Sequence, residues 1–193
     1  MDCRFARWKG ISGVSLLLFL AACMRLQAPV TASTERFRDL PAYFASEKKQ
    51  MEQAGLQFHK LVEQNGVRDS IITSDTGIIS KLLKPFAGIN LNKPSLRDQY
   101  ILDSVTNGFS GARSLSYTAR TPEVNPQQVL LETDSSGYIQ SVQIISRTSN
   151  LLYKTASTLI YEHLKTVSVS TDQQVVLLSP QHLSVQVRMY PKP

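Results

Sequence analysis

Cysteine is almost absent from this chain of 193 residues, which contains only Cys3 and Cys23. The residues that follow, 24 to 193, have none. A domain without cysteine has no disulfide, no thiolate nucleophile and no cysteine-ligated metal, so its stability must come from burial of a core. Roughly 170 residues suffice for one domain with a sizeable core.

The chain also has little excess of charge. It carries 21 Lys and Arg against 15 Asp and Glu, a formal net charge of +6. Three of these cations and one of the acids belong to residues 1–22, which leaves 18 basic and 14 acidic residues, or +4, for the rest. The basic residues are spread evenly and form no stripe that resembles a phosphate-binding footprint. We therefore expect no nucleic-acid partner.

No motif of the sequence carries a convincing catalytic nucleophile. Asp75-Thr76-Gly77 resembles the aspartic-protease triplet, but that mechanism needs two carboxylates on paired loops and only one such triplet is present. A helix cap at Asp75 explains the triplet better. Residues 108–112, Gly-Phe-Ser-Gly-Ala, approach the nucleophile elbow of hydrolases, but they lack its last glycine, and a strand-like segment follows where a helix is required.

Histidine is scarce as well, with only His59, His163 and His182. None of them has another ligand type at a short helical spacing, and His59 and His182 fall on the polar faces of predicted strands. Glu162 and His163 are adjacent on a predicted strand, so their side chains should point to opposite faces. We therefore predict no metal site, no cofactor and no catalytic residue, and an enzyme is the less favoured hypothesis.

A long hydrophobic run is missing too. The apolar stretch near residues 11–22 is about 12 residues long, whereas a helix that spans a bilayer needs about 20. Cations precede this stretch and small residues end it, which is typical of an export signal. Leu20-Ala21-Ala22-Cys23 resembles the lipobox of bacterial lipoproteins. That resemblance implies cleavage between Ala22 and Cys23 and lipidation of Cys23 with diacylglycerol and a further acyl chain such as palmitate.

The lipobox resemblance also implies a location. Several acyl chains anchor a protein stably, whereas one chain does not. Met24 stands where an aspartate would resemble an inner-membrane retention signal, so we expect the outer membrane, with the domain on its periplasmic face. Residues 23–34 would then form the lipidated cysteine and a flexible tether, and residues 35–193 a single domain. The alternative is an ordinary signal peptide in which Cys23 is incidental.

Helix signals are confined to the first part of the domain. A helix is predicted from about Glu35 to Gly55, with Pro41 in its first turns or at its true start. A second helix is predicted after Asp75 and should end at Pro85. The first apolar stripe consists of Phe37, Leu40, Tyr43 or Phe44, Lys48 and Met51, and the second of Ile78, Ile79, Leu82, Leu83 and Phe86.

Strand signals dominate the rest. Asn65-Gly66 between two strand-like runs predicts a hairpin with a type I′ turn, because both turn positions need positive φ. Further strands are predicted near 98–105, 112–120, 127–133, 138–147, 151–161, 165–171, 174–179 and 182–190. Since there is no room for crossover helices, the strands should pair antiparallel. The predicted fold class is α+β, with two helices packed on one face of a strongly twisted antiparallel meander sheet.

Two of these segments, LLYKTASTLIY and QQVVLLS, carry apolar residues on both strand faces, more than a sheet with one wet face requires. We therefore expect either that the helices fill the face completely, or that they leave an apolar surface for acyl chains or an apolar peptide. A sheet curled around two helices is comparable with the half-barrels of periplasmic lipid carriers, by fold-level analogy alone.

Three short motifs carry a wider resemblance: Ile89-Asn90-Leu91-Asn92-Lys93-Pro94, Asn150-Leu151-Leu152-Tyr153 and Leu159-Ile160-Tyr161. They are similar to segments of uncharacterised small lipoproteins of the Bacteroidetes phylum, which share the leader, an early helix, a hairpin and a sheet. The resemblance implies a cellular location and a fold, and it implies no catalytic residue. We expect a membrane-anchored, non-enzymatic binding or envelope-maintenance lipoprotein. The alternatives are a hydrolase with dispersed catalytic residues and a structural partner in an envelope complex.

Overall fold

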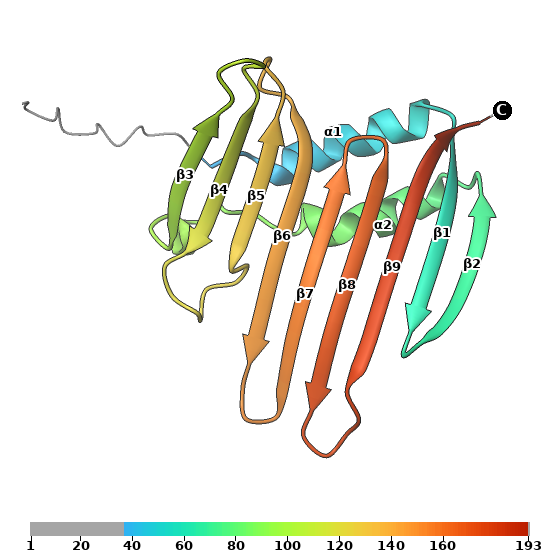
Figure 1. Ribbon diagram of the computed structural model, residues 1–193, viewed down its shortest axis with the longest axis vertical. Coiled ribbons are helices and arrows are strands. Elements are labelled where there is room, and N and C mark those ends of the chain that lie inside the picture. The colour runs from blue at the N-terminus through green and yellow to red at the C-terminus, as the bar shows by residue number, and fades with distance from the viewer. Residues whose placement is uncertain (1–36, 193) are drawn as a thin grey trace, which may run out of the picture. The chain divides into compact units, whose positions relative to one another are not determined.

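Two helices and a nine-stranded antiparallel sheet make up the computed structural model, which describes residues 37–192 (Figure 1). Residues Phe37–Pro193 form one compact unit, and all of the core described below belongs to it. The predicted α+β class, with helices on an antiparallel meander sheet, is confirmed.

Both helices begin or end differently from the prediction. Helix α1 spans Leu40–Gln53, and residues 37–39 before it are not helical. The Asp39 carboxylate accepts a hydrogen bond from the backbone N–H of Ala42 at 3.0 Å, so Asp39 is the cap and Pro41 lies in the first turn. The predicted start near Glu35 is wrong, because the residue before a proline avoids the helical conformation unless the helix starts there.

Helix α2 spans Gly77–Ala87. The Asp75 carboxylate accepts a hydrogen bond from the N–H of Gly77 at 2.8 Å, which fits a helix-start role for the triplet. Pro85 lies inside the helix and does not end it. A proline in the last turn removes a single backbone bond, and the turn then closes through the N–H of Gly88 and the carbonyl of Lys84 at 3.2 Å.

The sheet contains β1 (Leu56–Gln64), β2 (Val67–Thr73), β3 (Tyr100–Thr106), β4 (Arg113–Ala119), β5 (Gln128–Thr133), β6 (Ile139–Ser149), β7 (Tyr153–Glu162), β8 (Thr166–Val175) and β9 (Gln181–Pro191). Its strand order is β2-β1-β9-β8-β7-β6-β5-β4-β3, and a short 3-10 helix, Pro94–Leu96, precedes β3. The chain therefore runs as a meander from β3 to β9, and the β1–β2 hairpin joins the free edge of β9.

The turns decide which predicted strands exist. Asn65 and Gly66 have φ of 50° and 85°, so the hairpin turn forms as predicted. The separate strand predicted at 174–179 is wrong, because β8 ends at Val175 and residues 176–180 form the loop to β9. Leu177 in that loop has a φ of 67°, which a strand residue does not adopt.

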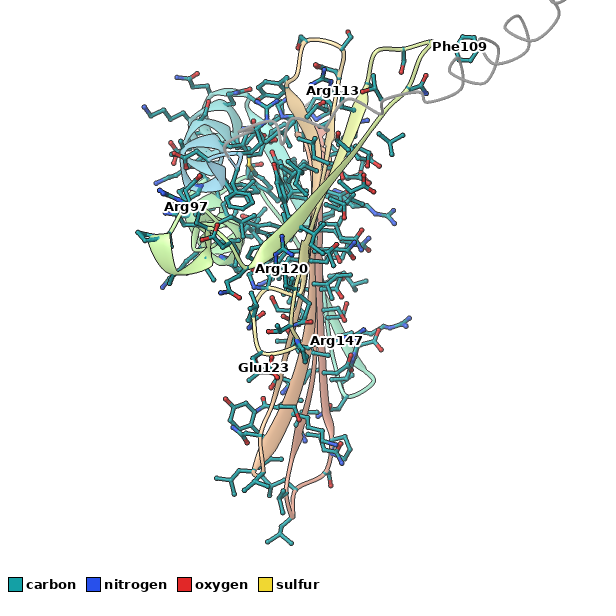
Figure 2. The ribbon with its side chains drawn as sticks, turned by 90° about the vertical axis from the view of Figure 1, so that its left-hand side faces the viewer. Arg97, Phe109, Arg113, Arg120, Glu123 and Arg147 are labelled. Atoms are coloured by element: carbon teal, nitrogen blue, oxygen red, sulfur yellow. The ribbon has the colours of Figure 1, made fainter. Side chains whose placement is uncertain are left out.

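Both helices lie on one side of the sheet, which we call the helix face, while the opposite side is the outer face (Figure 2). Aromatic side chains join the two layers: the Phe44 ring lies 5.2 Å from the ring of Phe86 and 5.2 Å from that of Tyr161. These three side chains are fully buried. The helices therefore fill the part of the helix face that they cover.

Candidate functional site

The helices cover only part of the helix face. The long strands β6 to β9 run well past α1 and α2 (Figure 1). Burial falls along β9 in the same direction: Val187 is fully buried, Val185 is partly buried, and Leu183 is 39% exposed. We therefore distinguish a covered half of the helix face, beneath the helices, from an uncovered half beyond them.

The uncovered half keeps a partly apolar surface, which we call the open face. It comprises Val62, Ile71, Val169, Thr171, Leu183 and Val185, which share the helix face by strand register. Val62 lies opposite Val185, which in turn lies opposite Val169, so aliphatic side chains continue across three strands. At the edge of this surface a depression of about 420 Å³ is lined by Val62, Gln64, Asn65, Val67 and Asp69.

Beyond the open face, two hairpin turns end in exposed aliphatic side chains. We call this set the apex; it comprises Leu151 and Leu152 of the β6–β7 turn and Val176, Leu177 and Leu178 of the β8–β9 turn. The two turns are neighbours, because the N–H of Val176 donates to the carbonyl of Leu152 at 2.9 Å. Most of the apolar residues expected on a second strand face therefore lie in these exposed turns, whereas Ile160 lies on the outer face of β7.

A polar depression of about 390 Å³ lies near the same end of the sheet, with Lys154, Asp172, Gln174 and His182 in its lining. His182 Nδ1 lies 2.7 Å from Asp172 Oδ1, and both side chains face the outer side, as the alternation of β9 predicts. A histidine held by a carboxylate is one part of a hydrolase site. A serine or threonine is not among the residues that line this depression.

A second cluster of titratable groups is buried between α1 and the sheet. Glu47 of α1 has no exposed surface, and its carboxylate accepts hydrogen bonds from the hydroxyls of Tyr138 and Tyr161. His163 Nδ1 lies 2.7 Å from Glu47 Oε2. Gln50 completes the cluster by donating to the Tyr138 hydroxyl at 2.9 Å. The buried carboxylate and both tyrosine hydroxyls therefore have hydrogen-bond partners across the helix–sheet interface.

The tyrosines of this cluster remain protonated donors. Burial, and next the hydrogen bond to Glu47, raises the pKa of Tyr161 far above its usual value of 10.0. Burial likewise raises the pKa of Tyr43, with the Glu47 charge as the second cause. The Tyr43 hydroxyl donates to the carbonyl of Ile139 at 2.9 Å. These bonds fix α1 on the sheet, and no residue of the cluster lines either of the two depressions described above.

The sequence-based prediction did not contain this cluster, because it placed Lys48 on the apolar stripe of the first helix. The buried stripe of α1 is Leu40, Phe44, Glu47 and Met51. Lys48 instead pairs with Glu52 at 3.7 Å on the solvent side. The sequence does contain the signal, because Leu40, Phe44 and Glu47 follow one another at steps of four and three residues and so share one face of the helix. A glutamate on the buried face of a helix needs a polar partner in the core. His163 lies in the β7–β8 turn and not on a strand.

The other predicted residues fall as follows. Ala22 and Cys23 lie outside the described residues. His59 is exposed on the outer face, where its ring lies 4.7 Å from that of Tyr190. Within residues 37–192, no group of three or more His, Cys, Asp or Glu side chains is placed to hold a metal ion. Neither helix of that range is long and apolar enough to cross a membrane.

These features define a class of protein by shape: a nine-stranded antiparallel sheet with two helices on half of one face and an apolar apex at the uncovered end. Comparisons with protein-family models, curated proteins and solved structures find no match. The resemblance to Bacteroidetes lipoproteins therefore stays a prediction. Of its motifs, residues 150–152 form the β6–β7 turn and Tyr153 begins β7, and residues 159–161 lie in β7, where Leu159 and Tyr161 are buried.

Proposed function

We propose that this protein is a lipid-anchored, non-enzymatic binding protein of the bacterial envelope, and that its open face holds an apolar ligand. The observation that carries the proposal is the half-covered helix face, on which Val62, Ile71 and Leu183 keep exposed aliphatic surface beside the packed core. Apolar surface next to a core stays exposed at a cost in free energy, and a ligand that covers it recovers that cost.

The chemistry of the open face favours acyl chains over charged ligands. Its aliphatic side chains alternate with hydroxyl-bearing residues such as Thr171 and, further across the face, Ser157 and Ser146. A methylene that leaves water completely gains about 0.8 kcal/mol, and an open surface buries each methylene only in part. Micromolar affinity requires about 8 kcal/mol, so an acyl chain lying across the open face fits binding of that order or weaker.

The proposal is tested by titrating the mature chain, residues 23–193 with Cys23→Ser, with a fluorescent fatty acid. Ile71→Gln combined with Leu183→Gln should weaken binding at least tenfold. The matched control is Ile72→Gln combined with Leu61→Gln on the outer face. Ile71 and Ile72 are 56% and 60% exposed, and Leu183 and Leu61 are both 39% exposed, so the two variants remove the same amount of apolar surface from opposite faces.

The outcomes separate the hypotheses. Binding that only the helix-face variant weakens supports the open face as the ligand site. Equal weakening by both variants would mean that the fatty acid adsorbs non-specifically. If no saturable binding is found, the ligand-site proposal is wrong and the structural-partner alternative is favoured. In that alternative the same exposed residues contact an envelope protein.

The anchor itself rests on the lipobox resemblance and is tested separately. Metabolic labelling with an acyl-chain analogue should mark the wild-type protein and miss Cys23→Ala. Fractionation of the wild type should place the label in the outer membrane. Equal labelling of both proteins would end the lipoprotein interpretation.

The second candidate function is a hydrolase, and only the Asp172–His182 pair favours it. Ser170 and Ser184 lie on the same outer face by strand register, each two residues from a member of the pair. Hydrolysis of simple esters by the mature chain, abolished by His182→Ala and by one of the two serine substitutions, would support this candidate. Esterase activity that survives His182→Ala would rule out a hydrolase site at this pair.

A further inference from the structure

We propose that the apex inserts into a lipid bilayer, so that the uncovered end of the domain rests on a membrane surface. This inference goes beyond the proposed ligand site, because it assigns a membrane contact to residues outside the open face. Leu151 and Leu177 are 95% and 98% exposed, and Leu152 and Leu178 are also mostly exposed. Four exposed leucines at one end of a domain form an apolar patch that scattered surface residues do not explain.

Several backbone N–H groups of the apex turns already have hydrogen-bond acceptors within the protein. The side chain of Asn150 accepts hydrogen bonds from the N–H groups of Leu152 and Tyr153, both at 2.8 Å. The neighbouring turn contributes the N–H of Val176, which donates to the carbonyl of Leu152 at 2.9 Å, and the N–H of Leu178, which donates to the carbonyl of Val175 at 3.1 Å. Backbone groups that are already paired can leave water at a small cost.

The fold does not require leucine at the tip of the β8–β9 turn. Leu177 has a φ of 67°, in the left-handed region that favours glycine or asparagine, and its side chain is almost fully exposed. A bulky residue in this conformation is strained, and strain of this kind concentrates at functional sites. Neither backbone geometry nor packing therefore accounts for the leucine, but contact with lipid does.

The residues behind the apex change in the order expected at a membrane surface. Residues 150–153 and 175–180 contain no charged side chain. Tyr153, partly exposed, follows directly on β7, and tyrosine is enriched at the level of lipid headgroups. Lys154 comes next, and Arg147 follows on β6 two residue pairs further along the ladder. Along β6 and β7, aliphatic, aromatic and cationic side chains thus succeed one another away from the tip, while β8 carries the exposed Asp172 at the level of Arg147. Cations attract anionic headgroups.

A bilayer fits the apex better than a protein does. The apex projects as a pair of turns, and the depression between them, lined by Leu152, Tyr153 and Val176 among others, holds only about 90 Å³. A stable protein interface uses about 20–30 residues on each side, with aromatic and arginine anchors near its centre. Five aliphatic residues on a projecting tip supply neither, whereas a fluid bilayer needs no matching shape.

The sequence offers a clean reporter for the experiment. Its single tryptophan, Trp8, lies in the leader, so the mature chain has none. We would introduce Leu177→Trp into residues 23–193 carrying Cys23→Ser, and add vesicles of phosphatidylethanolamine and phosphatidylglycerol, with and without brominated acyl chains. The matched control is Phe109→Trp, because Phe109 is equally exposed in the β3–β4 turn at the opposite end of the sheet (Figure 2).

We expect a blue shift and bromine quenching for Leu177→Trp and neither change for Phe109→Trp. A second variant, Leu151→Gln with Leu177→Asn, should lower vesicle partitioning at least about tenfold, since it removes two apolar side chains from the tip. Asparagine suits the positive φ at 177, so this variant keeps the turn. No change for Leu177→Trp, or equal changes at both ends, would overturn the inference.

The test also separates this inference from the proposed function. The open-face variant Ile71→Gln with Leu183→Gln should keep vesicle partitioning while it loses fatty-acid binding. The apex variant should do the reverse. Vesicle insertion without fatty-acid binding would leave the membrane contact standing and remove the ligand site. A tip that ignores vesicles but becomes protected by a soluble protein of the envelope would overturn the bilayer in favour of a protein partner.

Discussion

The covered and uncovered halves of the helix face differ in what fills them. Beneath the helices, the face consists of close-packed aromatic and aliphatic side chains, and its one buried carboxylate, Glu47, has partners from the opposite layer. Beyond the helices, the same strands carry Ser157, Thr171 and Leu183, all partly exposed or exposed. The hydrogen-bonded strands thus run without interruption from a buried environment beneath the helices into a solvent-exposed one beyond them.

The buried core therefore occupies only one length of these strands, and under our two proposals the remaining length is the part that contacts a ligand and a membrane. Core burial must supply the free energy of folding, and it does so only where the helices exclude water. The open face and the apex are then free to carry apolar side chains that contribute little to folding. If this division holds, the loss of stability caused by a substitution should become smaller as its distance from the helices increases.

The largest loss of stability should follow Phe86→Ala in the covered half. Phe86 is fully buried against Phe44, so its removal leaves a cavity and should cost about 3–5 kcal/mol. The midpoint of urea unfolding, followed by circular dichroism, measures this loss. Phe109→Ala, which removes an equal but exposed ring, should change the free energy of unfolding by less than about 0.5 kcal/mol. Similar losses for both variants would contradict the division.

A smaller loss should follow Glu47→Gln. The amide keeps one oxygen for Tyr161 and His163, but it turns its NH₂ group toward the Tyr138 hydroxyl, which then has no acceptor. A lost hydrogen bond to a charged group costs about 1.5–3 kcal/mol. Chemical denaturation measures the loss, and Glu52→Gln on the exposed side of α1 is the control. If both variants unfold at the same denaturant concentration, the cluster does not hold α1 on the sheet.

Gly66→Val tests the hairpin at the edge of the open face. Gly66 has a φ of 85° with open space where a Cβ would lie, so the penalty comes from backbone conformation alone. We expect a cost of about 1 kcal/mol or more. Gly108→Val adds the same side chain to an exposed turn where no positive φ is required, and it should unfold like the wild type. An unchanged denaturant midpoint for Gly66→Val would mean that the turn tolerates valine.

The smallest effect on stability is expected at the apex. Leu177→Asn removes an exposed leucine and supplies a residue that accepts the φ of 67°. The free energy of unfolding should stay within about 0.5 kcal/mol of the wild type or rise slightly. Thermal unfolding in the absence of membranes measures this. A large loss would mean that the apex leucines stabilise the fold and are not reserved for contact.

Local patterns predicted the fold class and failed where contacts are non-local. The alternation of residues 182–190 placed Val187 and Met189 on the buried face, and Asn65-Gly66 located the hairpin turn. The join between β1 and β9 leaves no such local pattern, since Leu56 lies opposite Pro191. The spacing of turns predicts a meander of neighbouring strands, but it does not predict that β9 pairs with β1 of the early hairpin.

The candidate site was only partly predictable for the same reason. The excess of apolar residues in 151–161 and 173–179 was recognised, and β7 lies near its predicted place, but residues 151–152 and 176–178 lie in turns. An aliphatic run in a turn looks like a strand until the backbone conformation is known. The boundary of the open face depends on where α1 and α2 end over the sheet, which no local pattern contains. Cys23 lies outside the described residues, so its lipidation stays a prediction.

The place of β9 in the strand order has a consequence for how the chain is made. The β1–β2 hairpin, near the start of the domain, finds its other neighbour only when residues 181–191 are available. Pairing across so long a sequence separation raises the contact order and slows folding. A polypeptide that emerges from its N-terminus therefore stays without a complete sheet until nearly its whole length is free. If the leader directs export as predicted, slow closure of this kind would keep the chain unfolded during its passage through a translocation channel, and pairing of β9 would complete the sheet afterwards.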